Sequence, residues 1–252
     1  IIDEAHHMSA PVFNRALHCL PARYVCGLSA TPERKDGLTN LLYYSMGTIA
    51  HRIERAPEHT LVSCMLYEGG KRKEIKYRDG RVSMPLMLNA LVADNERNLM
   101  IARHIVRFLD AGRHVIVLTD RIAQLKVLHE LLLERGVSAD AMGEYIGTTS
   151  VTERENSSSK PCILSTYSMA KEGLDIPRLD TLVMATPKGD IVQASGRVQR
   201  KHPEKATPLI VDVVDTFSVF EALRWKRWNF YRSEKFHCQT FDVTNDDVQW
   251  FA

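Results

Sequence analysis

Two adjacent carboxylates, Asp3 and Glu4, follow the apolar pair Ile1 and Ile2 at the start of the chain. In a doubly wound sheet, ligands bind beyond the carboxyl ends of the strands, which is where these two side chains would lie. Hydrolysis of a nucleoside triphosphate needs one carboxylate to hold Mg²⁺ and a second to orient and deprotonate the attacking water. A solvated turn at a strand end is the alternative, so the pair has to be weighed with the rest of the sequence.

Arg197 and Arg200 stand three residues apart, and Gln193 precedes them by about one helical turn. On a helix all three side chains would therefore lie on nearly the same face. Phosphoryl transfer builds negative charge on the phosphate oxygens, and a planar guanidinium donates paired hydrogen bonds to such oxygens. A basic surface helix is the alternative, which the complete spacing Gln-x-x-Gly-Arg-x-x-Arg disfavours.

Small hydroxyl, glycine and acidic residues follow other expected strands. Ser29 and Thr31 come directly after the apolar run 24–28, and Glu-Gly-Leu-Asp-Ile-Pro occupies 172–177. Gly173 would let the backbone approach a ligand closely. The sequence contains no Gly-x-x-x-x-Gly-Lys-Ser/Thr loop, the usual cradle for nucleotide phosphates.

In this order and at these separations, the four segments resemble motifs II, III, V and VI of superfamily 2 helicases and translocases, which are nucleic-acid motors with two RecA-like lobes. The resemblance implies ATP and Mg²⁺ as cofactors, with Asp3 as the metal ligand and Glu4 as the general base. It also implies that His6 couples the nucleotide site to motif III. Ser29 and Thr31 would link hydrolysis to movement between the lobes.

The same resemblance assigns roles to the downstream residues. Arg200 would be the arginine finger and Arg197 its partner at the γ-phosphate, while Gln193, Gly173 and Asp175 would line the nucleotide, Asp175 near the ribose or the metal. In this family the phosphate loop precedes the Asp-Glu-Ala-His box. We therefore expect the chain by itself to show no ATPase activity stimulated by nucleic acid.

Contacts to a nucleic-acid backbone are expected at strand ends and at one basic hairpin. With a net charge of +2, the chain must hold nucleic acid through local clusters and not through its overall field. Residues 61–67 and 74–77 are expected as the two strands of a β-hairpin with a basic tip. A solvated loop is the alternative for each candidate. The candidates are Thr119, Arg121, Thr166, Lys71, Arg72 and Lys73, of which Thr166 follows from the resemblance.

Apolar runs that alternate with helical patterns predict an α/β protein with parallel sheets covered on both faces. Asp94 is a suitable N-cap for a helix that Gly112 ends, and an aromatic-rich helix over 217–231 is expected to pack on the sheet. The expected buried strands are 115–118, 141–146, 162–165, 182–185 and 209–214.

We expect four parts along the chain. Residues 1–57 would be the C-terminal part of RecA-like lobe 1 and 58–92 a connector with the hairpin. Residues 93–235 would form a complete lobe 2, followed by a tail at 236–252. The five cysteines stand apart, which argues against disulfides and structural zinc and indicates a reducing compartment, either cytoplasm or nucleus.

No apolar run is long enough to span a bilayer, and no membrane partner is expected. A compact chain that ends soon after motif VI is typical of phage or large-virus members of the family.

The predicted function is that of an ATP-dependent DNA helicase or double-stranded DNA translocase. Motif VI ends in Arg-Val-Gln-Arg, where DEAD-box and DEAH-box RNA helicases show Arg-x-Gly-Arg, and 172–177 is similar to XPB-like, UvsW-like and restriction-subunit DNA translocases. RIG-I-like RNA sensors share part of that segment, so an RNA-directed motor is one alternative. A hydrolysis-deficient nucleic-acid-binding assembly module is another. A metal-dependent nuclease would require further clustered Asp, Glu or His ligands.

Overall fold

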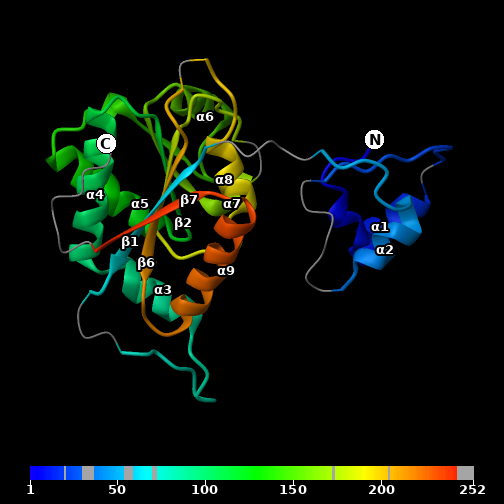
Figure 1. Ribbon diagram of the computed structural model, residues 1–252, viewed down its shortest axis with the longest axis horizontal. Helices are drawn as coiled ribbons and strands as arrows, with labels where there is room; N and C mark the ends of the chain where they lie inside the picture. Colours follow the sequence, from blue (N-terminus) through cyan, green and yellow to red (C-terminus); the bar gives the residue numbers. More distant parts are fainter. Residues whose placement is uncertain are drawn as a thin grey trace. The chain divides into compact units, whose positions relative to one another are not determined.

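The computed structural model describes residues 1–19, 21–29, 37–53, 59–69, 73–171, 174–203 and 205–242. It divides the chain into two units, Ile1–Ala56 (unit 1) and Pro57–Ala252 (unit 2), which are described separately (Figure 1). No helix within the described ranges is long and apolar enough to cross a membrane.

Unit 2 is built on one parallel sheet, to which the described residues contribute seven strands in the order β3-β4-β2-β5-β6-β1-β7. Each of the five predicted buried runs contains one strand, and the predicted α/β class is confirmed. The strands are β1 Leu61–Tyr67, β2 Val115–Thr119, β3 Met142–Tyr145, β4 Cys162–Thr166, β5 Thr181–Met184, β6 Leu209–Asp215 and β7 His237–Asp242.

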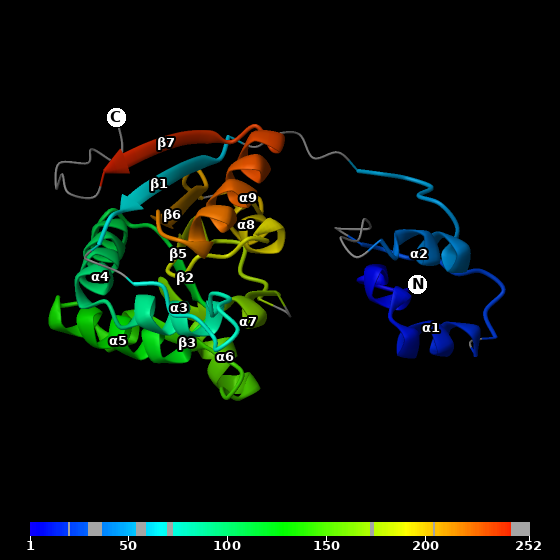
Figure 2. The same cartoon turned by 90° about the horizontal axis from the view of Figure 1, so that it is seen from below.

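Helices cover both faces of this sheet (Figure 2). Successive strand residues point to opposite faces, so Val117 of β2 packs in the core beneath α4 and α5, whereas Leu118 packs in the core beneath α7, α8 and α9. The helices of unit 2 are α3 Met84–Val92, α4 Asn95–Asp110, α5 Ile122–Glu134, the 3₁₀ turn η2 Ala139–Ala141, α6 Val151–Ser158, α7 Tyr167–Lys171, α8 Val192–Val198 and α9 Val219–Ser233.

Local sequence signals explain the ends of α4. The Asp94 side chain accepts a hydrogen bond from the Arg97 amide, as an N-cap does, and Gly112 has a φ of 74°, which favours glycine at a helix end. In α9, Phe220 and Tyr231 are buried as expected for a packing helix. Trp225 differs from this expectation, because 56% of its surface is exposed.

Strand β1 corrects the predicted organisation of residues 58–92. It lies between β6 and β7 in the sheet and pairs with both of them, so it does not form a hairpin with 74–77. A shorter hairpin exists instead, in which Lys76 bridges Val82 in antiparallel fashion. Residues 61–67 therefore belong to the sheet and not to a separate connector. Similarly, β7 adds an edge strand where a tail was expected.

Unit 1 contains the 3₁₀ turn η1 Ala5–Ser9 and the helices α1 Pro11–His18 and α2 Thr39–Met46. Ile2 makes a parallel bridge with Gly27. A Cβ atom at Gly27 would lie 2.8 Å from the Cβ of Ala5, closer than such atoms normally approach. Glycine is therefore needed here for η1 to pack directly on the segment that pairs with Ile2.

The cysteines differ in burial, and we expect their reactivity to differ accordingly. Burial raises the pKa of Cys162 to about 12 and also raises that of Cys64, whereas Cys19 and Cys26 are exposed. Because the thiolate is the nucleophile, iodoacetamide should modify Cys19 and Cys26 in the native protein and reach Cys162 only after unfolding in urea. Peptide mass spectrometry would measure this, and rapid native labelling of Cys162 would contradict the buried position of β4.

Candidate active site

In unit 1, backbone pairing brings the ends of two separate segments together in space. The amide of Ile2 donates to the Cys26 carbonyl, and the amide of Leu28 donates to the Ile2 carbonyl, both at 2.8 Å. The Ala5 amide also donates to the Leu28 carbonyl at 2.8 Å. Residues that follow these short runs, Glu4 on one side and Ser29 on the other, must therefore lie close to each other.

His6 joins the two segments through its side chain. Its Nδ1 lies 3.0 Å from the Ser29 Oγ and 3.2 Å from the Glu4 Oε2. The structure thus places Glu4, His6 and Ser29 in one polar cluster, and Asp3 is exposed beside it. Thr31 lies outside the described residues.

Glu4 has an unusual backbone conformation, with φ of 49° and ψ of 43°. A non-glycine residue in this left-handed region costs roughly 1 kcal/mol and is found most often in turns and functional sites. The Asp3 Oδ1 accepts a hydrogen bond from the Glu4 amide at 2.8 Å, which steadies this turn. The Asp3 carboxylate thus bonds to the Glu4 amide, whereas the Glu4 carboxylate contacts His6.

A magnesium ion is compatible with this cluster because Mg²⁺ typically uses one or two protein carboxylates together with phosphate oxygens and water. The exposed carboxylate of Asp3 can serve as such a ligand. Among the residues that the structure describes, no group of three or more His, Cys, Asp or Glu side chains could by itself hold a metal ion. The nuclease alternative, which requires a larger ligand cluster, therefore gains no support from them.

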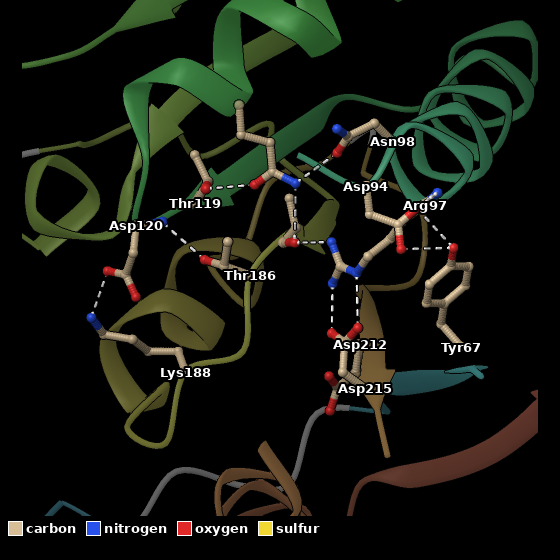
Figure 3. A network of polar contacts seen from close by, with 12 residues as sticks. Tyr67, Asp94, Arg97, Asn98, Thr119, Asp120, Thr186, Lys188, Asp212 and Asp215 are labelled. Atoms are coloured by element: carbon tan, nitrogen blue, oxygen red, sulfur yellow. Dashed lines mark hydrogen bonds and ion pairs between the residues drawn. The ribbon is translucent and has the colours of Figure 1, made fainter. Parts of the chain in front are cut away.

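In unit 2, a buried polar network lies under the carboxyl ends of β2, β5 and β6 (Figure 3). Arg97 of α4 donates from Nε and Nη2 to the two carboxylate oxygens of Asp215, at 3.0 and 2.8 Å. Its Nη1 donates to the carbonyl of Ala185 at 2.6 Å. Both charged side chains are 0% exposed, so this ion pair ties α4 to the ends of β5 and β6 from inside the protein.

The network continues into β2, where it includes Thr119. The Thr119 hydroxyl donates to the Gln124 Oε1 at 2.7 Å, and Gln124 Nε2 donates to the Asn98 Oδ1 at 2.9 Å. Thr119 is completely buried and also accepts the Arg121 amide. The hydroxyl therefore supports the loop from below, and the contact of Thr119 with nucleic acid stays a prediction.

Arg121 is partly exposed but is engaged with α3. Its Nε donates to the Asn89 Oδ1 at 2.7 Å, and its Nη2 donates to the Pro85 carbonyl at 3.3 Å. The residue therefore holds the first and middle turns of α3 against the loop that follows β2. Its Nη1 donates to the Asp120 carbonyl at 3.0 Å. Any contact with a phosphate would therefore have to use the remaining N–H groups of Nη1 and Nη2.

Two further contacts join the loop that follows β2 to the loop that follows β5. The Asp120 amide donates to the Thr186 Oγ1 at 2.9 Å, and Lys188 Nζ pairs with the Asp120 Oδ1 at 2.7 Å. The same ammonium lies 5.2 Å from the ring centre of Tyr167. Sequence reasoning missed Lys188, although a cation shortly after a buried strand could have signalled it.

Arg197, for which a role at the γ-phosphate stays a prediction, is bonded to backbone carbonyls at the end of α7 and just after it. Its Nε, Nη1 and Nη2 donate to the carbonyls of Ala170, Leu174 and Lys171, at 2.9, 2.7 and 2.8 Å. The last carbonyls of a helix have no partner within that helix, and a cation there is favourable. Arg197 therefore links α8 to the end of α7, and all three of its nitrogens are used by this link and not directed to a phosphate.

Arg200 forms an ion pair with Asp175, two residues that the sequence placed at the same nucleotide site. The Arg200 side chain is 33% exposed and that of Asp175 73% exposed, so solvent reaches the pair. Gln193 is partly buried on α8, and Thr166 is partly exposed at the end of β4, where its Oγ1 lies 3.1 Å from the Ser168 Oγ. Gly173 lies outside the described residues.

The basic segment before the hairpin is described only in part. Lys73 is exposed, whereas Lys71 and Arg72 lie outside the described residues. The hairpin that the structure does form turns at residues 78–80.

Comparison with known proteins places this architecture among the helicases. The chain is 32% identical over 251 residues to "Putative ATP-dependent RNA helicase L396" of Acanthamoeba polyphaga mimivirus, covering 97% of this chain and 48% of that protein. It is 29% identical over 227 residues to "Probable helicase D10" of Escherichia phage T5, covering 85% and 48%. The chain thus spans about half the length of these curated relatives. No family model matches the chain.

The fold agrees with these sequence matches. The chain superposes with a TM-score of 0.59 on the fragment structure of a putative HsdR subunit of a type I restriction enzyme from Vibrio vulnificus, at 17% identity and covering 88% of this chain and 45% of that one. At this identity the likeness concerns the fold alone. The chain is therefore similar to viral and phage helicases, and its parallel sheet has the RecA-like fold of a helicase lobe.

Proposed function

We propose that the intact protein is an ATP-dependent DNA helicase or double-stranded DNA translocase. The observation that carries this proposal is the cluster of Glu4, His6 and Ser29, which parallel pairing of Ile2 with Gly27 assembles from two separate segments. A general base beside a histidine that contacts a hydroxyl on the neighbouring strand end is suited to hydrolysis that must be communicated to another part of the molecule. Residues 1–57 would then be the last part of lobe 1.

Within this site each residue has a distinct task. Asp3 would hold Mg²⁺, which when bound neutralises charge on the phosphates of ATP. Glu4 would orient the attacking water and accept its proton. His6, held between Glu4 and Ser29, would transmit the state of the carboxylate to the segment that follows 26–28.

Arg200 would supply positive charge to the transferring phosphoryl group. It lies directly after α8 and its ion pair with Asp175 is open to solvent, so the guanidinium can exchange one anionic partner for another without crossing the core. Arg197, in contrast, would position α8 by its three bonds to the end of α7. Because β4 ends at Thr166 and α7 begins at Tyr167, nucleic acid contacting Thr166 would act on the same end of the lobe.

DNA is the preferred substrate because motif VI and residues 172–177 are similar to those of DNA translocases. RNA is the second candidate, since the mimivirus relative is named an RNA helicase.

We expect duplex DNA to stimulate ATP hydrolysis by the intact protein more than duplex RNA does. The comparison needs several salt concentrations, because contacts to phosphates release counterions and weaken steeply as salt rises. Glu4→Gln is the matched control, since it removes the general base and should leave bound ATP unhydrolysed. Stronger stimulation by RNA would move the protein to the RNA-directed branch. Nucleic-acid binding without any stimulated hydrolysis would favour the assembly module instead.

A further inference from the structure

The hairpin at 75–83 is a well-formed element that the sequence did not predict. The Ser83 amide donates to the Ile75 carbonyl and the Tyr77 amide to the Arg81 carbonyl, both at 2.8 Å. At the tip, the Gly80 amide donates to the Tyr77 carbonyl at 3.0 Å, and Gly80 has a φ of 82°. This is the arrangement of a three-residue hairpin loop with glycine at its left-handed position. The tip is therefore held in a defined shape.

The base of the hairpin is anchored in a small hydrophobic core. Ile75 and Val82 pack against a cluster formed by α3 and the start of α9, including Met87 and Phe220. Glu74, just before the hairpin, accepts a hydrogen bond from the Ser218 hydroxyl at 2.7 Å. The base of the hairpin is thus packed against the protein through Ile75 and Val82, whereas residues 76–81 are exposed to solvent.

The hairpin stands at the carboxyl edge of the sheet. Ser218 belongs to the loop that follows β6, and Arg121, in the loop that follows β2, holds the helix α3 into which the hairpin leads. Both loops emerge where the strands end, the edge at which the proposed nucleic-acid contacts lie. In Figure 1 this teal segment extends beyond α3, away from the sheet.

An aromatic ring and cations are exposed at the tip. Tyr77 is 49% exposed although its amide is hydrogen-bonded to the Arg81 carbonyl across the hairpin, and the neighbouring Arg78 is exposed and forms no ion pair with the described residues. Asp79 is occupied by Arg81, through contacts of 2.7 Å to Nε and 3.0 Å to the amide. The ion pair with Arg81 neutralises Asp79. The tip therefore presents the ring of Tyr77 beside the positive charge of Arg78.

We propose that the hairpin 75–83 binds single-stranded nucleic acid, with an unpaired base stacked on Tyr77 and a backbone phosphate on Arg78. Stacking on an exposed ring requires a base whose face is free, which a paired duplex offers only at its end. A guanidinium one residue away suits the phosphate that flanks such a base. This inference rests on the proposed function for the presence of nucleic acid. It adds a site that binds single strands in preference to duplex.

Tyr77→Ala in the 252-residue chain tests the proposal without requiring hydrolysis. Fluorescence anisotropy with a fluorescein-labelled oligothymidylate should show binding weakened about 5- to 100-fold, the scale for loss of one base–aromatic stack. Tyr77→Phe keeps the ring and should retain most of the affinity. The matched control is Tyr44→Ala, because Tyr44 is 87% exposed and has neutral neighbours in sequence.

Affinity for a blunt duplex should change far less than affinity for oligothymidylate when Tyr77 is replaced. Equal weakening by Tyr77→Ala and Tyr44→Ala, or unchanged binding by Tyr77→Ala with an unchanged melting temperature, would overturn the assignment of this hairpin. In both cases the parent chain still binds, so the proposed function is untouched. If the parent chain binds no nucleic acid in any form, the proposed function fails along with the hairpin.

Discussion

Replacing Arg97 by alanine is expected to lower the free energy of unfolding of unit 2 by about 3–5 kcal/mol, the usual cost of removing one partner from a buried ion pair. The guanidinium makes three hydrogen bonds, two to the Asp215 carboxylate and one to the Ala185 carbonyl. Without it, the Asp215 charge would remain in a fully buried position and lose its bidentate partner (Figure 3).

Urea denaturation followed by circular dichroism would measure the loss. The matched control is Arg103→Ala, on the same helix but exposed, which should leave the midpoint nearly unchanged. The double variant Arg97→Met with Asp215→Leu should recover much of the stability, because it removes both charges and fills the space with apolar atoms. A midpoint for Arg97→Ala equal to that of Arg103→Ala would show that the buried pair does not hold α4 to the sheet.

In the intact protein, replacing Arg200 by alanine is expected to lower kcat for ATP hydrolysis by roughly three orders of magnitude, the scale of an arginine finger. ATP binding should weaken far less, because the guanidinium acts mainly on charge that develops in the transition state. Steady-state ATPase assays at saturating DNA, together with a nucleotide-binding titration, separate these two effects.

Lys201→Ala is the control for Arg200, since it removes an adjacent, exposed positive charge that the proposed chemistry does not use. A near-parental rate for Arg200→Ala with unchanged stimulation by DNA would remove the finger role from this residue. An equally large loss for Lys201→Ala would instead indicate that the general positive field of this loop matters, and not the geometry of one guanidinium.

Both predictions concern the same physical arrangement. The buried pair of Arg97 and Asp215, continued by Gln124 and Thr119, holds the strand ends from below. The loops that follow β2 and β5 are thereby restricted in their backbone conformations. The ion pair between Asp120 and Lys188 joins these two loops. Polar groups buried in low dielectric are costly unless fully bonded, so this network also selects one arrangement of the edge.

The elements of unit 2 could be predicted from the sequence because their signals are local. Short apolar runs marked β2 to β6, and the cap of Asp94 with Gly112 marked the bounds of α4. The resemblance to the superfamily could also be recognised, since each of its motifs is a short run of residues close together in the sequence. Proximity of Glu4 and Ser29 followed from the same motifs and required only that two segments pair side by side.

Tertiary structure alone decided the rest. Partners of a parallel strand are distant in sequence, and nothing within 61–67 indicates that it lies between 209–215 and 237–242. Likewise, Thr119 stands at a strand end that sequence reasoning assigns to the surface, yet Gln124 and Asn98 close over it. The three carbonyls that bind Arg197 become neighbours only when α7 and α8 pack together, because a side chain's partners are set by the fold and not by its own type.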